Sequence, residues 1–170
     1  MIETKNLILR PFTLDDTGKV YLMSLEDGMK KWIPDQVYAD ENESREVLEF
    51  LISCYNKPDP KTKPFVLGIE LKGTGELIGH AGLSSLNNGE VEIGYAIEEK
   101  HQGKGYATEA IKAMCKYALE KFDLDRIIGI VASENKGSVK ALEKAEFSFI
   151  EEKERNAFGR LALCKTYVFN

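Results

Sequence analysis

Residues 91–108 of the chain read VEIGYAIEEKHQGKGYAT. The first seven predict a β-strand, the polar residues after them predict a turn, and Gly103 and Gly105 lie where the next helix is expected to begin. The start of a helix presents unpaired backbone N–H groups and a partial positive charge, which favour phosphate binding. Glycine places no Cβ atom between a bulky anion and the backbone, and Lys104 adds charge at the rim. The stretch therefore predicts a diphosphate site.

The glycine pair alone has a second interpretation, a tight strand-to-helix turn without a ligand. Two nucleotide-binding motifs are disfavoured. A P-loop needs GxxxxGK followed by Ser or Thr, whereas Tyr106 follows Gly105 and the upstream spacing differs. A dinucleotide fingerprint needs a third glycine where Thr108 stands, inside a parallel βαβ unit, and the strands before this turn are expected to be antiparallel.

The flanking patterns predict the rest of the fold. Strands are expected over 3–12, 65–71, 76–86, 90–97, 126–132, 147–155 and 160–169, and helices over 14–25, 40–55, 105–121 and 138–145. Three of the five prolines lie in residues 56–64, which predicts an extended loop. These seven strands and four helices predict a single α+β domain over residues 1–170, with a mixed, mostly antiparallel sheet.

Composition narrows the function classes. The chain has 170 residues, with 23 Lys and Arg against 28 Asp and Glu, a net charge of −5. This acidic balance argues against non-specific binding to nucleic acid or to anionic membranes. Cys54, Cys115 and Cys164 are far apart in the sequence, and neither they nor His80 and His101 form a metal-ligand cluster. No apolar run is long enough to span a bilayer, so we expect a cytoplasmic protein without a metal.

The central stretch resembles a known superfamily. Gln102–Ala107 (QGKGYA) matches the Q/R-x-x-G-x-G/A acyl-CoA signature of the GCN5-related N-acetyltransferases, abbreviated GNAT. The strand before it and the ATEA after it match equally closely, and Asn135, Ser138 and Leu142–Phe147 resemble later elements of the superfamily. The opening, Thr4–Asp16, is similar to the RimJ/RimL branch of ribosomal-protein N-terminal acetyltransferases. The resemblance thus covers the whole chain.

The resemblance implies a cofactor and its site. Acetyl-CoA would lie between two splayed central strands, the one that ends at Ile97 and the one at 126–132. Backbone groups of the first strand would pair with the pantetheine, the N–H groups that begin at Gln102 would hold the diphosphate, and Asn135 and Ser138 would border the thioester. The implied cofactor residues are Tyr95, Ala96, Ile97, Gln102, Gly103, Lys104, Gly105, Tyr106, Ala107, Thr108, Asn135 and Ser138.

Acetyl transfer to nitrogen needs a neutral amine, so a proton must be removed. Glu92 is the candidate base, because it lies on the strand that leads to the acyl site and superfamily members often use a carboxylate here. The alternative role of Glu92 is that of a surface charge that faces a neighbouring strand. Direct attack of the amine on the thioester forms a tetrahedral oxyanion, which a strand N–H near Tyr95 or Ile97 is expected to hold.

The departing thiolate must be neutralised. The superfamily frequently supplies a Tyr for this, and Leu142 stands at the matching position. Ser138 is the candidate substitute, acting directly or through water. The alternative role of Ser138 is an N-cap of the helix that follows.

Acceptor recognition is expected in residues 26–64 and in the antiparallel strands that follow them. The candidate substrate-binding residues are Trp32 and Tyr38, in the segment KKWIPDQVY, and Glu92; the alternative role of the aromatic pair is to pack a loop onto the core. The charged run Glu151–Arg155 is expected to be a solvated strand edge. The sequence therefore predicts a monomeric or homodimeric enzyme that transfers acetyl from acetyl-CoA to a primary amine, on a protein N-terminus or a small molecule. A non-catalytic acyl-CoA-binding module and a nucleotide-binding regulator remain alternatives.

Overall fold

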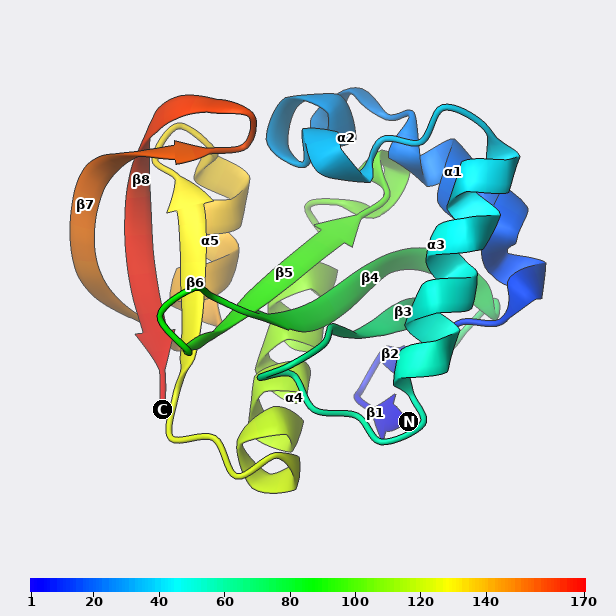
Figure 1. The fold of residues 1–170 in the computed structure, drawn as a ribbon, viewed down its shortest axis with the longest axis horizontal. Helices are drawn as coiled ribbons and strands as arrows, with labels where there is room; N and C mark the ends of the chain where they lie inside the picture. The colour runs from blue at the N-terminus through cyan, green and yellow to red at the C-terminus, as the bar shows by residue number, and fades with distance from the viewer.

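The computed structural model describes residues 1–170, which form one eight-stranded sheet in the order β1-β2-β3-β4-β5-β6-β8-β7 (Figure 1). The β5–β6 pair is parallel and every other pair is antiparallel. The strands are β1 (Ile2–Glu3), β2 (Leu7–Arg10), β3 (Phe65–Leu71), β4 (Glu76–Ser85), β5 (Val91–Ile97), β6 (Ile127–Ala132), β7 (Ser148–Ala157) and β8 (Arg160–Phe169). The helices are α1 (Thr17–Ser24), α2 (Asp27–Trp32), α3 (Glu41–Cys54), α4 (Tyr106–Lys121) and α5 (Lys136–Lys144), with 3-10 turns η1 (Leu14–Asp16), η2 (Pro34–Gln36) and η3 (Glu99–His101).

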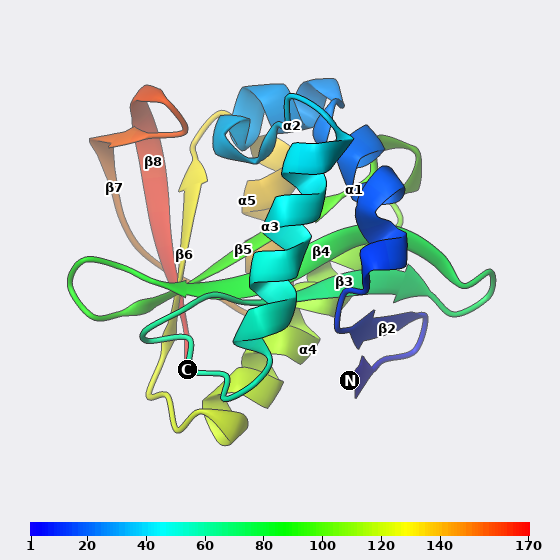
Figure 2. The same ribbon diagram turned by 45° about the vertical axis from the view of Figure 1, so that its right-hand side comes forward.

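Helices cover both faces of the sheet. Figure 2 shows α3 and α1 in front of the central strands and α4 behind them. The larger core, a cluster of 25 buried residues, joins the sheet to α4 and α5, and a smaller core of Phe12, Met23, Leu48 and Leu77 joins it to α1 and α3. The predicted α+β class is therefore confirmed. No helix is long and apolar enough to cross a membrane.

The two central strands separate soon after they meet. The only β5–β6 partners in the ladder are Glu92 and Ile128. Beyond them β5 runs away from β6, as Figure 1 shows, so the β6-facing backbone edge of β5 has no ladder partner. This confirms the expected splay and opens a cleft at the carboxyl ends of both strands.

Several predicted boundaries differ from the structure. The sheet has eight strands instead of about seven, because the expected first strand is two, separated by a bend. That bend is fixed by the Glu109 carboxylate, which accepts hydrogen bonds from the Thr4 hydroxyl and the Asn6 backbone N–H at 2.5 and 2.7 Å. There are five α-helices instead of four, because α2 and η2 form in a segment expected to be a loop. A two-residue strand and a six-residue helix are too short to show a hydrophobic period.

Candidate active site

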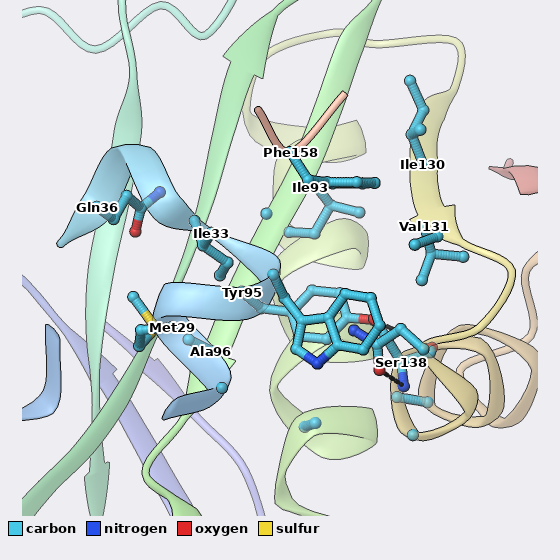
Figure 3. A pocket seen from close by; sticks show the side chains of 18 of the residues that line it. Met29, Ile33, Gln36, Ile93, Tyr95, Ala96, Ile130, Val131, Ser138 and Phe158 are labelled. Carbon is cyan, nitrogen blue, oxygen red and sulfur yellow. Dashed lines mark hydrogen bonds between the residues drawn. The ribbon is translucent and has the colours of Figure 1, made fainter. Parts of the chain in front are cut away.

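A cavity of about 2080 Å³ occupies the cleft between β5 and β6. It extends from the turn between β5 and α4 to the turn between β7 and β8. Helix α2 and η2 line it between these turns, since the Gly28 N–H donates to Glu99 of the first turn at 3.0 Å and Trp32 lies beside Arg160 at the second. In Figure 3 Tyr95 extends toward Ser138, and Met29, Ile33 and Phe158 are among the apolar side chains that line the cavity. The cavity therefore has a turn end at the start of α4 and a far end at the β7–β8 turn, and Glu92 is among its lining residues.

The turn end is built from backbone. Gly103 and Gly105 have φ angles of +75° and +85°, which glycine adopts without strain, and a Cβ atom on either would meet no other atom within 4 Å. Gly105 is the N-cap of α4, so the N–H groups of its first turn have no helical acceptor. No acceptor bonds the N–H groups of residues 103–108 anywhere in the structure. Six consecutive donors at a helix N-terminus form a surface suited to a phosphate group.

Gln102 and Lys104, two residues predicted to bind the cofactor at this turn, form hydrogen bonds within the protein instead. The N–H group of Gln102 already donates to the Glu99 carbonyl at 3.2 Å, and its side chain donates to the Ile97 carbonyl at 2.8 Å. Gln102 therefore ties the turn to β5, and the free donors begin at Gly103. Lys104 does not line the cavity, because its Nζ donates to the Lys100 carbonyl at 3.3 Å.

A cluster of ion pairs lies next to this turn, at the start of β4 and in η3. Glu76, Glu98 and His101 offer oxygen and nitrogen atoms within 4.8 Å of one another, a grouping that the sequence spacing did not indicate. Lys19 contacts Glu98 at 2.6 Å and Lys100 contacts Glu76 at 2.5 Å, and hydrogen bonds from Lys100 and Lys19 lower the pKa of Glu76 to about 2. Ammonium groups thus already neutralise the carboxylates, and the cluster joins the start of β4 to η3.

Glu92 faces the cavity from β5. Burial disfavours its charged form and raises the pKa of Glu92 to about 7, although the nearby positive charge of Arg155 acts in the opposite direction. A carboxylate with this pKa exchanges its proton near neutral pH, which is the property of a general base. The side chain is half-buried and lines the cavity, unlike a fully exposed surface charge.

Ser138 and Tyr95 form a hydroxyl pair in the cavity. Their oxygens are 2.5 Å apart, and the Tyr95 hydroxyl also lies 3.2 Å from the Ser138 carbonyl as a donor (Figure 3). Burial raises the pKa of Tyr95 to about 12, so it stays protonated at neutral pH. Leu142 is 1% exposed and packs in the core instead of lining the cavity.

The predicted capping role of Ser138 is wrong. The N-cap of α5 is Asn135, whose side-chain oxygen accepts the Ser138 N–H at 3.2 Å. Ser138 is instead the third residue of the helix, and its hydroxyl is left for Tyr95. Asn135 and Ser138 both line the cavity.

Of the two aromatic residues predicted to contact the acceptor, only Trp32 lies at the far end of the cavity. Trp32 lines the cavity, with the Lys31 Nζ 4.4 Å and the Arg160 Cζ 5.9 Å from its ring centroid. Tyr38 does not line it, because the chain turns away after η2 and the Tyr38 N–H contacts Ser24 at the end of α1.

Sequence reasoning missed further residues that line the cavity. Arg155 was expected on a solvated edge, yet its side chain lines the cavity across the sheet from Glu92. Met29, Ile33 and Phe158 also line it: Met29 comes from the short helix α2, and Ile33 and Phe158 come from connections between elements. Alternation along β7 places Arg155 on one face, but the face that meets the cavity depends on how β7 pairs at the sheet edge.

Comparison with known proteins adds independent findings. A family model described as an acetyltransferase (GNAT) domain matches residues 6–148. The uncharacterized N-acetyltransferase YnaD of Bacillus subtilis (strain 168) is 31% identical over 144 residues, which are 84% of this chain and 79% of the relative.

Solved structures share the fold. An acetyltransferase (GNAT family) from Bacillus anthracis superimposes with a TM-score of 0.82 at 25% identity, covering 99% of this chain and 96% of that chain. RimL, a ribosomal L7/L12 alpha-N-protein acetyltransferase in complex with coenzyme A, superimposes with a TM-score of 0.80 at 17% identity, covering 98% of this chain and 94% of that chain. The shared architecture therefore extends over nearly the whole chain.

Proposed function

The chain belongs to the GNAT acetyltransferase family, and we propose that it transfers the acetyl group of acetyl-CoA directly to a primary amine, on a small molecule or a protein N-terminus. One observation supports this most strongly. A row of free N–H groups at residues 103–108 lies at one end of the same cavity that contains Glu92, a half-buried carboxylate whose pKa is about 7. An anion site and a base in one cleft fit a phosphate-bearing acyl donor and an amine acceptor.

The unpaired backbone groups of the cleft match the hydrogen-bonding groups of coenzyme A. The amides of 103–108 are suited to its diphosphate, and the open space at Gly103 and Gly105 leaves room for that group. Tyr95, Ala96 and Ile97 lie on the edge of β5 that has no ladder partner, so their peptide groups suit the amides of pantetheine. RimL, which shares the fold, is described in complex with coenzyme A. The bound co-substrate supplies an activated acetyl group.

Glu92 would take the proton from the acceptor amine. The amine nitrogen would then attack the acetyl carbon, the carbon–sulfur bond would break, and the remaining extra proton on the nitrogen would pass to the leaving sulfur. A lysine-like amine has a pKa of about 10.4 and an α-amino group about 8, so most acceptor arrives protonated at neutral pH. Because Glu92 has a pKa of about 7, an ionised fraction is present near that pH to accept the proton.

The Ser138–Tyr95 pair would assist the leaving sulfur. When Tyr95 donates to the Ser138 oxygen, the hydroxyl hydrogen of Ser138 is free to turn toward the cavity. Both hydroxyls stay protonated at neutral pH, so the pair can donate a hydrogen bond to the departing thiolate. This arrangement offers a donor although Leu142 stands where a Tyr is usual in the family.

Replacing Ser138 with alanine is expected to lower kcat about tenfold, because one charge-assisted hydrogen bond to the leaving group is lost. Acetyl-CoA affinity, measured by calorimetry, is expected to stay within about twofold, because the N–H donors at 103–108 are untouched. Ser148→Ala, an exposed change at the start of β7, is the matched control. Unchanged kcat in Ser138→Ala would remove this hydroxyl from the mechanism.

A panel of amines tests the proposed activity itself. Release of free CoA is measured with amino acids, peptides, polyamines and aminoglycosides, while calorimetry measures acetyl-CoA binding in parallel. Binding without CoA release for any amine would favour the non-catalytic acyl-CoA-binding module. Displacement of acetyl-CoA by ATP or NAD at comparable concentrations would favour the nucleotide-binding regulator.

A further inference from the structure

We infer that Arg155 binds a carboxylate of the acceptor, and that the acceptor is a free α-amino acid with an apolar side chain. This inference rests on the proposed function, because it names the acceptor class of the same site. Arg155 lines the cavity from β7, and its positive charge acts on Glu92 on β5. The cavity thus contains both a carboxylate and a guanidinium, contributed by strands on opposite sides of the β5–β6 cleft.

The guanidinium of Arg155 is held in place but only partly satisfied. Its Nη2 donates to the buried Thr166 hydroxyl at 2.9 Å and lies 3.5 Å from Glu151. Its Nε is buried and has no hydrogen-bond acceptor, and no hydrogen bond involves Nη1. The Nε atom is shielded from the cavity, so the Nη1 hydrogens, which have no partner, are the donors that a ligand oxygen can reach. The planar guanidinium suits two carboxylate oxygens at once.

Another arginine that lines the cavity, Arg160, already has partners for its charge. Arg160 pairs with Glu134 and lies over the Trp32 ring, so its charge is already matched. Arg155 pairs only with Glu151, at 3.5 Å, and its Nη1 makes no hydrogen bond, so it retains donors for an acceptor. Because Glu92 lines the same cavity, the two groups together complement a zwitterion, whose ammonium faces the Glu92 carboxylate and whose carboxylate faces the guanidinium.

The surroundings indicate the side chain that such an acceptor carries. Ile33, which precedes η2, and Phe158 in the β7–β8 turn line this part of the cavity, and a Cβ atom on Gly159 would lie 3.5 Å from Pro34, so the two segments are adjacent (Figure 3). Apolar side chains favour an apolar group over a charged one, because burial of a charge without a partner is costly. A polyamine or an aminoglycoside would instead bring a second cation toward Arg155.

L-Leucine and 3-methylbutylamine test this inference, because they differ only in the carboxylate. Two readouts are used: kcat/KM for acetylation, and the fluorescence of Trp32, the only tryptophan, which lines this cavity. Leucine is expected to exceed the amine about 10- to 100-fold in both kcat/KM and affinity. In Arg155→Gln the ratio of leucine to amine is expected to fall to about one. Loss of the Arg155 charge also raises the pKa of Glu92 and slows both acceptors alike, so the ratio and the leucine affinity are the quantities that test the inference.

Controls separate the possible outcomes. Arg155→Lys keeps the charge without the fork and is expected to retain part of the preference, and Arg45→Gln, on the outer surface of α3, is expected to retain all of it. Equal values for leucine and the amine, or equal values for leucine and leucinamide, would overturn the inference. A peptide that begins with leucine and outperforms free leucine would do the same.

The two proposals can fail separately. If acetyl-CoA neither binds nor releases CoA with any amine, the proposed function fails, while Trp32 fluorescence still reports whether leucine binds through Arg155. If CoA is released but no acceptor shows a carboxylate preference, the acetyltransferase activity stands and the inference about Arg155 is wrong.

Discussion

Glu92→Gln is expected to lower kcat/KM about 10²- to 10⁴-fold at pH 7, the usual contribution of a positioned general base. Glutamine keeps the shape of the side chain and cannot accept the proton. In the wild type, kcat/KM should rise with pH through about 7 as Glu92 loses its proton, and again as the acceptor amine becomes neutral. In the variant the first rise should disappear and the second should remain. Rates from pH 5.5 to 9.5 with one acceptor measure this.

The stability of the same variant provides a control. Folding raises the pKa of Glu92, so the folded protein loses stability as the pH rises from the ordinary Glu value of about 4.5 toward 7. Glutamine does not ionise, and Glu92→Gln should therefore have a higher Tm than the wild type at pH 8. A slow but more stable variant excludes unfolding as the cause, and Glu120→Gln on the exposed side of α4 should change neither quantity. A pH profile identical to that of the wild type would remove Glu92 from the mechanism.

Gly105→Val is expected to weaken acetyl-CoA binding about 100-fold or more, measured by calorimetry. The φ of +85° is strongly unfavourable for a β-branched residue, so the turn must change its backbone path and displace the N–H donors of 103–108. A side chain that does stay in place would project into the space next to those donors. Loss of one or two charge-assisted hydrogen bonds accounts for a change of this size.

Gly75→Val is the matched control for this change. Gly75 has a φ of +70° and no atom within 4 Å of its Cβ position, like Gly105, but it lies in the β3–β4 turn and does not line the cavity. The two variants should lose similar stability, and only Gly105→Val should lose acetyl-CoA. Equal affinities in Gly105→Val and the wild type would show that the cofactor does not use this turn.

The parts of the fold that could be predicted from sequence carry strong local signals. The strand at 65–71 and the glycine turn before α4 are predicted at their observed positions, because β-rich runs between Gly-containing turns and a glycine pair before a helical period have few alternative structures. The splay of β5 from β6 came from the family resemblance instead. It depends on a parallel pairing between distant segments, which no local pattern specifies.

The candidate site could be predicted only where it is made of backbone or of a single strand. The turn at 103–108 and Glu92 belong to one continuous stretch of sequence. The Tyr95–Ser138 pair joins β5 to α5, and Arg155 lines the same cavity as Glu92 from a strand at the far edge of the sheet. Such contacts follow from tertiary packing, so the charged run around Arg155 resembles any solvated edge when only its sequence is considered.

The most direct test of the acetyl-CoA site is an amide ¹⁵N–¹H NMR titration of the whole protein. Acetyl-CoA should shift the signals of Gly103 and Gly105 strongly downfield, because their N–H groups gain phosphate acceptors. S-acetylpantetheine, which carries the thioester without the phosphates, should shift the signals of β5 residues and leave both glycine signals near their starting positions. If acetyl-CoA binds and the signals of 103–108 do not move, or if both ligands move them equally, the assignment of the diphosphate to this turn is contradicted.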